Sequence, residues 1–375
     1  MNIPQEWTVK PLADVVEIQR GFDLPHHARK PGPYPVLTAG ETGGFHDEGP
    51  IKGPGVTIGR ATNLGRPKWS NVDFWPHNTT MFVKDFKGNN PRWVYHLFEA
   101  TDLSGFDSGS VQPMLNRNYI AQVPVRVPPV LEQQAIADVL GALDDKIAAN
   151  NKVARTIEAL GSAKFMRVGM DVEPSREVIL LGEVFDLNPR RTVTSSSPTV
   201  IDMQALPTAE PLVERWSTGI RKGGTRFANG DTLIARITPC LENRKTAFVD
   251  FLEDGDVGIG STEFIVMRSK NDLPLGLSYF MAISDRFRDF AIQNLVGTSG
   301  RQRVSASDLA RHTLCPVDLA ILQSFGQWAD TNLKVLGSLR GENRILITMY
   351  DALLPQLMSG KLRIREAEEA VTAVI

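Results

Sequence analysis

The sequence predicts an α+β protein in which two mixed globular domains alternate with two long helices. Three observations predict this class. Two segments show helical periodicity over an unusual length, the segments before them are rich in glycine and proline with short β-type runs, and the chain repeats itself after about 180 residues. At 375 residues, and with a prior of about 150 residues per domain, the chain can bury two or three separate cores.

The first long helix is predicted from Leu131 to about Phe165, directly after the prolines at 128 and 129. The second is predicted from Leu319 to Met358, with an apolar stripe of Ile321, Phe325, Trp328, Val335, Leu339, Leu346, Met349 and Leu353. Helices of about 35 residues span roughly 50 Å, which one small domain cannot cover, so we expect the two helices to cover each other. The alternative is that each packs separately on its own domain.

Each predicted stripe contains one asparagine, Asn150 in the first helix and Asn332 in the second. In coiled coils an asparagine in the seam fixes the register at some cost in stability. These two residues therefore favour paired helices.

The segments before the helices echo each other. Matching runs are Leu12–Ile18 and Leu181–Leu187, Thr57–Arg60 and Leu233–Arg236, and Ser108–Gln112 and Thr298–Gln302. The period is too long for a solenoid and indicates a domain duplication. Two diverged copies held by rigid helices could read two parts of one target at a fixed separation.

Composition excludes several classes. The net charge is −2, so bulk charge gives no support for nucleic-acid binding, which has to be argued from local clusters. The longest stretch without a charged residue runs only from Leu273 to Ser284, and the N-terminus lacks a secretory pattern, so we expect a cytoplasmic protein without a membrane span. Cys240 and Cys315 are expected to be reduced packing residues.

The sequence lacks the common catalytic motifs. A phosphate loop, GxSxG and HExxH are absent, and the Asn-Pro pairs continue as Asn90-Pro91-Arg92 and Asn188-Pro189-Arg190 rather than as a methyltransferase loop. Asp73, Asp85 and Lys87 loosely fit a magnesium-dependent nuclease pattern, which leaves a stand-alone nuclease as an alternative; a charged turn explains them more simply. The six histidines show no ligand spacing and are expected at the surface or in contacts, so no metal site is expected.

Basic residues gather on glycine-rich segments in both halves, with glutamine and asparagine among them. Arg and Gln can read base edges, while Lys and backbone N–H groups hold phosphates. The candidate DNA-binding residues are Arg20, Arg60, Lys68, Gln112, Arg226, Arg236, Asn243, Lys245, Arg301, Gln302 and Arg303.

Several motifs resemble one known family, the specificity subunits of type I restriction-modification systems. The junction Val127–Gln134 (VPPVLEQQ), followed by the ALDDKI run ending at Ile147, looks like the start of the family's conserved helix. Leu353–Leu362 is similar to the end of the second conserved helix. Gly230–Asn243, Gly260–Phe264 and Gly297–Val304 resemble one recognition-domain subtype. The second helix departs from the pattern, because Cys315–Leu319 lacks the Pro-Pro and Glu-Gln pairs.

The resemblance implies a non-catalytic subunit with two target recognition domains. The implied segments are a first recognition domain at 1–130, a central helix at 131–170, a second recognition domain at 171–316, a C-terminal helix at 317–365 and a tail at 366–375. The helices would form an antiparallel coiled coil that sets the spacer of a split, asymmetric target in double-stranded DNA.

The implied partners are two modification (methyltransferase) subunits and two restriction (translocase and nuclease) subunits. S-adenosylmethionine, ATP and Mg²⁺ would act on those partners and not on this chain. The helix positions expected to bind partners are Ile136, Leu143, Ile147, Ile157, Phe325, Trp328, Leu339 and Leu346. A structural adaptor without sequence preference is the other alternative.

Overall fold

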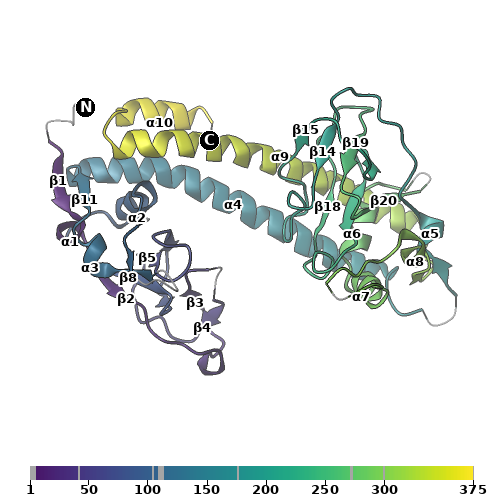
Figure 1. Cartoon of the computed structure of the whole chain (residues 1–375), viewed down its shortest axis with the longest axis horizontal. Coiled ribbons are helices and arrows are strands. Elements are labelled where there is room, and N and C mark those ends of the chain that lie inside the picture. Colours follow the sequence, from purple (N-terminus) through teal and green to yellow (C-terminus); the bar gives the residue numbers. More distant parts are fainter. Residues whose placement is uncertain are drawn as a thin grey trace. The chain divides into compact units, whose positions relative to one another are not determined.

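The computed structural model describes residues 6–40, 43–103, 105–108, 114–174, 177–270, 273–298 and 300–374. It divides into two compact units, shown together in Figure 1. Unit 1 comprises residues 1–148 and 345–375, and unit 2 comprises residues 149–344. Each long helix contributes one part to each unit.

The two predicted long helices are confirmed. Helix α4 spans Val130–Val168 and helix α9 spans Leu319–Met358, with 39 and 40 residues. α4 is followed by Gly169, whose φ of 72° suits a glycine after a helix end. Asp318 caps the start of α9, because its carboxylate accepts from the backbone N–H of Ala320 at 2.7 Å. Among the described residues, no helix combines the length and the apolar character that crossing a bilayer requires.

Unit 1 is built on a four-stranded antiparallel sheet with the strand order β2-β8-β5-β6. A smaller sheet has the order β4-β3-β7, and β1 pairs with β11. The strands are β1 (Thr8–Pro11), β2 (Glu17–Arg20), β3 (Tyr34–Leu37), β4 (Phe45–His46), β5 (Gly55–Gly59), β6 (Pro67–Ser70), β7 (Trp75–Pro76), β8 (Thr80–Asp85), β9 (Asp107–Ser108), β10 (Met114–Leu115) and β11 (Pro124–Val127). The short helices are α1 (Leu12–Val15), a 3₁₀ turn (His26–Ala28), α2 (Pro91–Ala100), α3 (Arg117–Ile120) and α10 (Ile364–Thr372).

Unit 2 has a corresponding architecture. Its four-stranded antiparallel sheet has the order β13-β20-β17-β18. Its smaller sheet also has four strands, of two or three residues each, in the order β15-β14-β19-β16, whereas that of unit 1 has three, and β12 pairs with β21. The strands are β12 (Ile179–Leu180), β13 (Phe185–Leu187), β14 (Thr199–Ile201), β15 (Ser217–Thr218), β16 (Arg226–Phe227), β17 (Thr232–Ala235), β18 (Thr246–Phe248), β19 (Gly258–Gly260), β20 (Phe264–Ser269) and β21 (Thr313–Leu314). The short helices are α5 (Leu181–Val184), α6 (Leu277–Ile283), α7 (Asp285–Gln293) and α8 (Ala306–Leu309).

Two of the three echoed pairs occupy matching places in the two units, and most of Ser108–Gln112 lies outside the described residues. Leu12 begins α1 and Leu181 begins α5, and each helix is followed by the first strand of a four-stranded sheet. The backbone N–H of Leu12 donates to Val123 at 2.9 Å, and that of Leu181 donates to His312 at 2.8 Å. In both smaller sheets one pair is parallel, β3 with β7 and β14 with β19.

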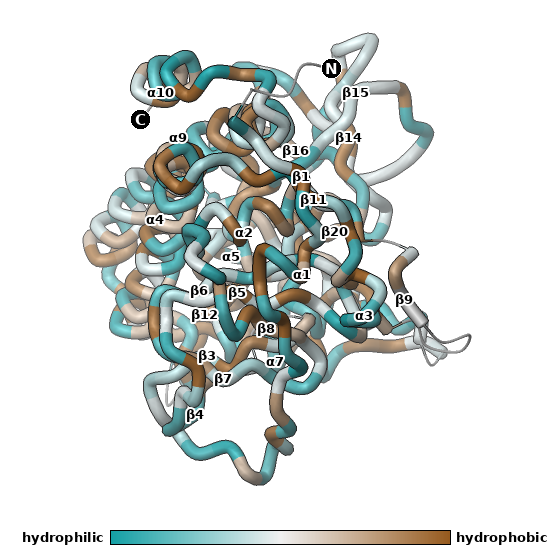
Figure 2. The backbone as a smooth tube through the Cα atoms, turned by 90° about the vertical axis from the view of Figure 1, so that its left-hand side faces the viewer, coloured by the Kyte–Doolittle hydropathy of each residue, from teal (hydrophilic) through white to brown (hydrophobic). Residues whose placement is uncertain are grey.

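The long helices share an apolar core with the globular part of each unit. In unit 1, Leu140 of α4 and Leu353 of α9 belong to one buried cluster. In unit 2, Phe165 of α4 packs on Phe325 of α9, with ring centroids 5.4 Å apart. Figure 2 shows hydrophobic and hydrophilic residues alternating along these helices, as a helix with one buried face requires.

Part of the predicted α9 stripe is wrong. Ile321 and Val335 are 50% and 42% exposed, whereas Leu322 and Leu336 are buried. The predicted spacing started one position too early, so it followed the edge of the apolar face rather than its centre.

The two seam asparagines behave differently. Asn150 is 5% exposed and donates to Glu342 Oε2 at 2.8 Å and to Asn343 Oδ1 at 2.9 Å, so it connects α4 to α9 within unit 2. Asn332 donates to the Trp328 carbonyl of its own helix at 2.8 Å. Of these two asparagines, only Asn150 makes a polar contact with the other long helix.

The Glu-Gln-Gln run at the start of α4 attaches that helix to the globular part of unit 1. Glu132 accepts from Trp7 Nε1 at 2.9 Å. Gln133 is fully buried, donates to Asn89 Oδ1 at 2.8 Å and accepts from the Asn90 backbone N–H at 2.9 Å. Gln134 accepts from the Asn90 side chain at 2.6 Å. α9 lacks this run and begins with the Asp318 cap instead.

Most of the segment predicted as a C-terminal tail is helical. α10 lies alongside the end of α9 in Figure 1, and its Ala367 and Val371 are buried in the unit 1 core. These two side chains lie one helical turn apart, which places them on the same face.

Leu322→Ala should lower the free energy of unfolding by about 2–5 kcal/mol, because it removes a buried side chain and leaves a cavity. Ile321→Ala is the matched control on the adjacent, half-exposed position and should change it by less than about 0.5 kcal/mol. Denaturant unfolding of both variants checks this. Equal effects would contradict the burial assigned to the two positions.

Candidate nucleic-acid interface

The central strands β5 and β17 each lead into a candidate arginine. In unit 1 the Arg60 backbone N–H donates to Thr79 at 2.9 Å, and in unit 2 that of Arg236 donates to Glu263 at 3.0 Å. The carbonyl of Arg60 accepts from Leu115 at 2.9 Å, and that of Arg236 accepts from Val304 at 3.0 Å. The two arginines therefore hold equivalent positions, each bonded through its backbone carbonyl to Leu115 or Val304.

In unit 2 the segment before Val304 is a hairpin. Val296 and Arg303 exchange backbone hydrogen bonds of 3.0 and 2.9 Å, and the chain between them contains Gly297, Thr298, Gly300, Arg301 and Gln302 among the described residues. Arg301 is exposed and Gln302 is half-buried. No partner for either side chain is found among the described residues, so both can reach a ligand.

Arg303 is held differently from its neighbours. Its Nε donates to Glu263 Oε2 at 2.8 Å, and its Nη2 donates to Glu263 Oε1 at 2.8 Å. The hydrogen bond from Arg303 is the main reason why the pKa of Glu263 is lowered. Nη1 donates to the Arg301 carbonyl at 2.9 Å. The Arg303 side chain therefore braces the hairpin.

Other unit 2 candidates also have partners within the chain. The Arg226 guanidinium donates to the carbonyls of Gly223 and Gly224 at 3.3 and 3.0 Å. Lys245 Nζ donates to the carbonyls of Met203 and Leu206 at 2.7 and 3.0 Å. Asn243 is exposed.

The unit 1 candidates lie toward one end of the sheet. Arg20, Met81, Ile58 and Pro67 are successive register partners across the strands β2, β8, β5 and β6. Lys68 follows Pro67 on β6. Arg20 is exposed, while Lys68 is half-buried and contacts the Gly40 carbonyl. Gln112 lies outside the described residues.

None of the helix positions expected to bind partners is exposed. Ile136, Leu143, Phe325 and Leu346 are buried in the chain's own cores, and Ile147, Ile157, Trp328 and Leu339 are partly buried there. The exposed large apolar residues of these helices are Val130, Leu131, Val153, Leu160 and Met166 on α4 and Leu319, Ile321, Val335, Ile345 and Ile347 on α9. The sequence reasoning did not assign any of them to partner binding. The seven-residue spacing of Val153 and Leu160 was the available signal.

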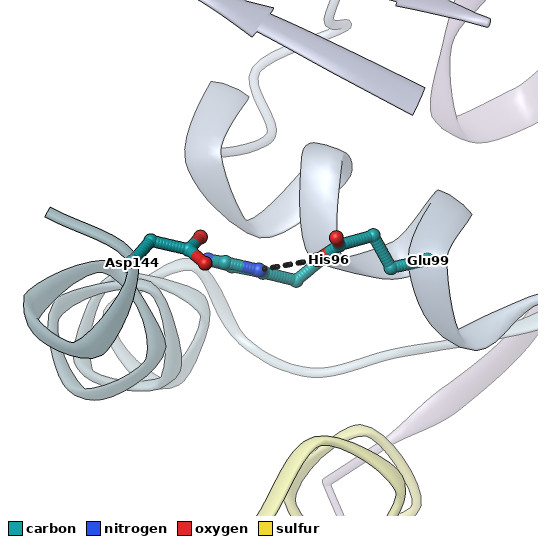
Figure 3. Close-up of side chains that lie close together, drawn as sticks. All are labelled: His96, Glu99 and Asp144. Carbon is teal, nitrogen blue, oxygen red and sulfur yellow. Dashed lines mark hydrogen bonds and ion pairs between the residues drawn. The ribbon is translucent and has the colours of Figure 1, made fainter. Parts of the chain in front are cut away.

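Of the two places expected for the histidines, His46, His96 and His312 are in contacts rather than at the surface, because they are 5%, 0% and 1% exposed. In unit 1, His96 lies between Glu99, which is also on α2, and Asp144, which is on α4 (Figure 3). Its Nδ1 is 3.1 Å from Glu99 Oε2 and 2.9 Å from the Tyr350 hydroxyl of α9.

These are residue types that can bind a metal, but their charges are already balanced. Arg92 Nη2 donates to Asp144 Oδ2 at 2.9 Å. Burial by itself raises the pKa of Glu99, but hydrogen bonds from His96, Tyr350 and Tyr95 bring it below its ordinary value. Because an arginine cation sits on Asp144, we interpret the cluster as a polar connection of α2 to both long helices.

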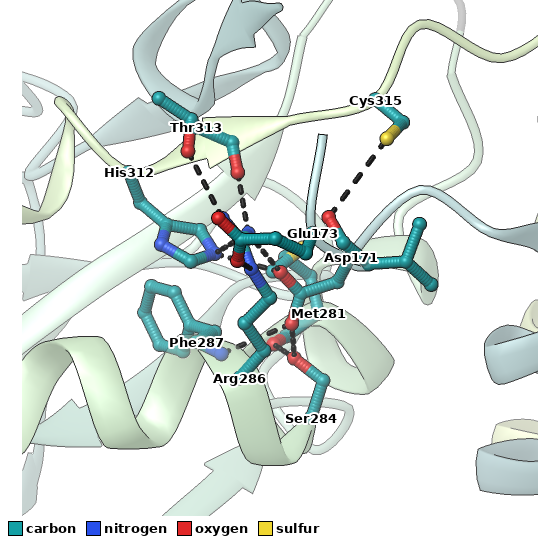
Figure 4. A network of polar contacts seen from close by, with 10 residues as sticks. Asp171, Glu173, Met281, Ser284, Arg286, Phe287, His312, Thr313 and Cys315 are labelled. Carbon is teal, nitrogen blue, oxygen red and sulfur yellow. Dashed lines mark hydrogen bonds and ion pairs between the residues drawn. The ribbon is translucent and has the colours of Figure 1, made fainter. Parts of the chain in front are cut away.

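A second buried network, in unit 2, is centred on Asp171 (Figure 4). Its carboxylate is 2% exposed, accepts from the Ser284 hydroxyl at 2.6 Å and lies 2.7 Å from His312 Nε2. Arg286 Nη1 donates to it at 3.1 Å. The carboxylate occupies the centre, so serine and histidine do not contact each other as a nucleophile and base would. The network ties the end of α4 to α7 and β21.

Asp144→Asn should flatten the pH dependence of unfolding between about pH 4 and pH 8. Burial, followed by the charge of Glu99, raises the pKa of Asp144 to about 7 from 3.8. Because the folded-state pKa is raised, the carboxyl contributes a free energy of unfolding that is present at low pH and is lost as the pH rises through about 7. An asparagine side chain can still accept a hydrogen bond from Arg92 but does not titrate, so this pH dependence should disappear. Urea unfolding at several pH values measures the slope. The control is Asp145→Asn, whose side chain is 74% exposed; an equal change there would contradict the assignment.

Comparisons with known proteins agree with these features. Residues 4–159 match the family model described as the type I restriction modification DNA specificity domain. The chain is 30% identical over 156 residues to the type I restriction enzyme EcoEI specificity subunit of Escherichia coli, and 32% identical over 133 residues to the EcoAI specificity subunit of the same species. These matches span 38% and 33% of this chain but only 26% and 22% of the relatives.

A crystal structure of the S subunit of a type I restriction-modification system from M. genitalium has the same overall fold. The TM-score is 0.64 at 12% identity, over 95% of this chain and 96% of the other. The predicted α+β class is therefore confirmed, and the resemblance predicted from the sequence motifs is confirmed by the family model and by the named relatives. Residues 4–159 are therefore similar to the DNA specificity domain of type I restriction-modification systems, a match that covers less than half of the chain.

Proposed function

We propose that this chain is the DNA sequence-recognition subunit of a type I restriction-modification complex and that each unit's globular part reads one half of a split, asymmetric target. The observation that carries this proposal is the shared strand order of the two units, with Arg60 and Arg236 at equivalent backbone positions. The family match covers only residues 4–159, so the role of the second globular part rests on this structural repetition.

The proposed domains are those expected from the sequence: recognition domains at 1–130 and 171–316, with helical segments at 131–170 and 317–365. α4 and α9 would pair as an antiparallel coiled coil whose length sets the spacer between the half-targets. The Asn150 contacts with Glu342 and Asn343 support such a pairing, because they restrict which helix positions can face each other.

The proposed partners are double-stranded DNA, two modification subunits and two restriction subunits. S-adenosylmethionine, ATP and Mg²⁺ would serve those subunits. Since the predicted seam residues are buried, we place the docking surface on the exposed apolar positions of the helices, including Val153, Leu160 and Met166. An apolar stripe in water favours a protein partner.

The nuclease alternative has less support. Asp73 Oδ2 accepts from Lys52 Nζ at 2.6 Å, and the Lys87 ammonium contacts the Ala13 carbonyl. Lys87 is therefore turned toward α1, away from the role of steadying an attacking hydroxide. The adaptor alternative differs only in lacking sequence preference, so the experiment has to measure sequence preference.

Modified-base sequencing of DNA from cells that contain the presumed methyltransferase partner, with and without this chain, tests the function. A new adenine-methylated, two-part motif that requires this chain is the expected result. A stable complex of the two proteins that yields no motif would favour the adaptor, and cleavage by the purified chain with Mg²⁺ that Asp85→Ala abolishes would favour the nuclease.

Arg301→Ala and Arg303→Ala should act differently. Arg301 is free to contact a base, so its loss should relax one base position of one half-target, at about 1–3 kcal/mol. Arg303→Ala should weaken binding to every base position of that half-target, because it releases the hairpin. Glu263→Ala should have the same effect. The double variant should be no worse than either single variant, because the pair acts as one unit. Binding to single-base target variants measures this; a one-base effect of Arg303→Ala without a Glu263→Ala effect would contradict it.

A further inference from the structure

Two exposed apolar side chains recur at matching positions of the two units. In unit 1, Val9 and Val130 are 56% and 55% exposed, and in unit 2, Val178 and Leu319 are 54% and 59% exposed. A single exposed apolar residue is ordinary on a protein surface. A pair that recurs in both copies of a diverged repeat calls for a physical reason.

The match between Val9 and Val178 follows from the two-stranded ribbon at the start of each unit. β1 pairs with β11 and runs directly into α1, and β12 pairs with β21 and runs directly into α5. The last residues of β1 and β12 are Pro11 and Leu180, and Val9 and Val178 each lie two residues before them. Both valines therefore hold the same place in the repeat.

The match between Val130 and Leu319 follows from backbone hydrogen bonds. The first N–H groups of α1 and α5 donate to the carbonyls of Val123 and His312, which makes these two residues equivalent. α4 begins at Val130 and α9 begins at Leu319, each seven residues further along the chain. Both exposed residues are therefore the first of their long helix.

In unit 1 the two positions lie in the same region. The strand register puts Thr8 opposite Val127, at the ribbon end from which the chain continues into α4. Trp7 Nε1 donates to Glu132 Oε2 at 2.9 Å and so joins the residues before β1 to the first turn of α4. Val9 therefore lies near the start of α4, beside which Figure 1 shows β1 and β11.

Unit 2 repeats this arrangement. Ile179 pairs with Leu314, at the ribbon end from which the chain continues into α9, and Val178 precedes Ile179. Leu131, 86% exposed, and Ile321, 50% exposed, widen the two apolar surfaces. We call these surfaces the root patches, because each lies at the start of a long helix; they consist of Val9, Val130 and Leu131 in unit 1, and of Val178, Leu319 and Ile321 in unit 2.

The chain itself leaves both root patches uncovered. Among the residues that the structure describes, β1 pairs only with β11 and β12 only with β21, so no further strand covers either ribbon. Each long helix does bury the position six residues after its first residue, since Ile136 and Phe325 are 1% and 6% exposed. The apolar residues at the helix starts are thus left for contacts outside the chain.

We propose that each root patch binds one copy of the same partner protein, through an apolar surface of that partner. A surface that serves a single contact needs to be apolar once, whereas a partner that presents one surface in two copies requires the same patch in both units. The modification subunits of the proposed function are such a partner, so this inference rests on that function. It assigns two equivalent docking sites, one in each unit, in addition to the exposed positions in the second half of α4.

Native mass spectrometry of the full chain with excess purified modification subunit counts the bound copies. The parent chain should bind two copies. Val9→Asp with Val130→Asp should leave one copy, and Val178→Asp with Leu319→Asp should also leave one, because a carboxylate in an apolar interface loses its hydration. The chain with all four substitutions should bind none.

Matched controls are Val72→Asp in unit 1 and Ile220→Asp in unit 2, at side chains that are 53% and 87% exposed and lie outside the root patches. Both control variants should bind two copies. Alanine at the same four positions removes apolar area without adding charge, so each pair should weaken binding in its own unit about tenfold. Hydrogen exchange of the one-copy complexes identifies which unit remains occupied.

The outcomes separate this inference from the proposed function. Two copies on every aspartate variant would overturn the inference, and so would loss of both copies from a variant in one unit. A change only in the number of bound restriction subunits would give the patches a different partner and would also overturn it. If the copies respond as expected but the complex shows no sequence preference, the recognition function fails and the docking sites stand. A parent chain that binds no modification subunit would overturn both.

Discussion

The structure depends on the apolar faces of two helices that neither globular part can cover alone. In unit 1 the first part of α4 shares its core with the last part of α9 and with α10, so this unit needs both ends of the chain. In unit 2 the remaining parts of the same helices complete the core. Because burying a leucine side chain contributes about 1.5–3 kcal/mol, removing either helix would leave both cores open.

Polar side chains decide how these helices attach. Apolar contacts alone allow a helix to slide along its neighbour, because one apolar contact can replace another. A buried amide left without its hydrogen-bond partner instead costs about 1–3 kcal/mol of folding free energy. Asn150 meets that requirement only opposite Glu342 and Asn343, and Gln133 only opposite Asn89 and Asn90. The first contact restricts the helix register in unit 2, and the second restricts how α4 leaves the globular part in unit 1.

The repeated fold separates a constant framework from variable loops. The same backbone bonds hold Arg60 and Arg236, but the residue that receives the backbone N–H is Thr79 in one unit and Glu263 in the other. Thr79 accepts from the Ala39 backbone N–H at 3.1 Å, while Glu263 binds Arg303 and braces a hairpin. One strand order can thus present different surfaces on the two units.

The sequence by itself determined the α+β class, the extent of both long helices and the matching segments, because periodicity, proline positions and repeated motifs are local properties of the chain. It also pointed to the family through the junction at Val127–Gln134. It did not determine which helix positions are buried, since a shift of one residue separates exposed Ile321 from buried Leu322. Tertiary structure alone decided that Arg303 is braced by Glu263 while Arg301 stays exposed, because Glu263 lies 40 residues away in the sequence. It also explains Gly161 in the middle of α4, where a Cβ would lie 2.2 Å from the Phe280 ring.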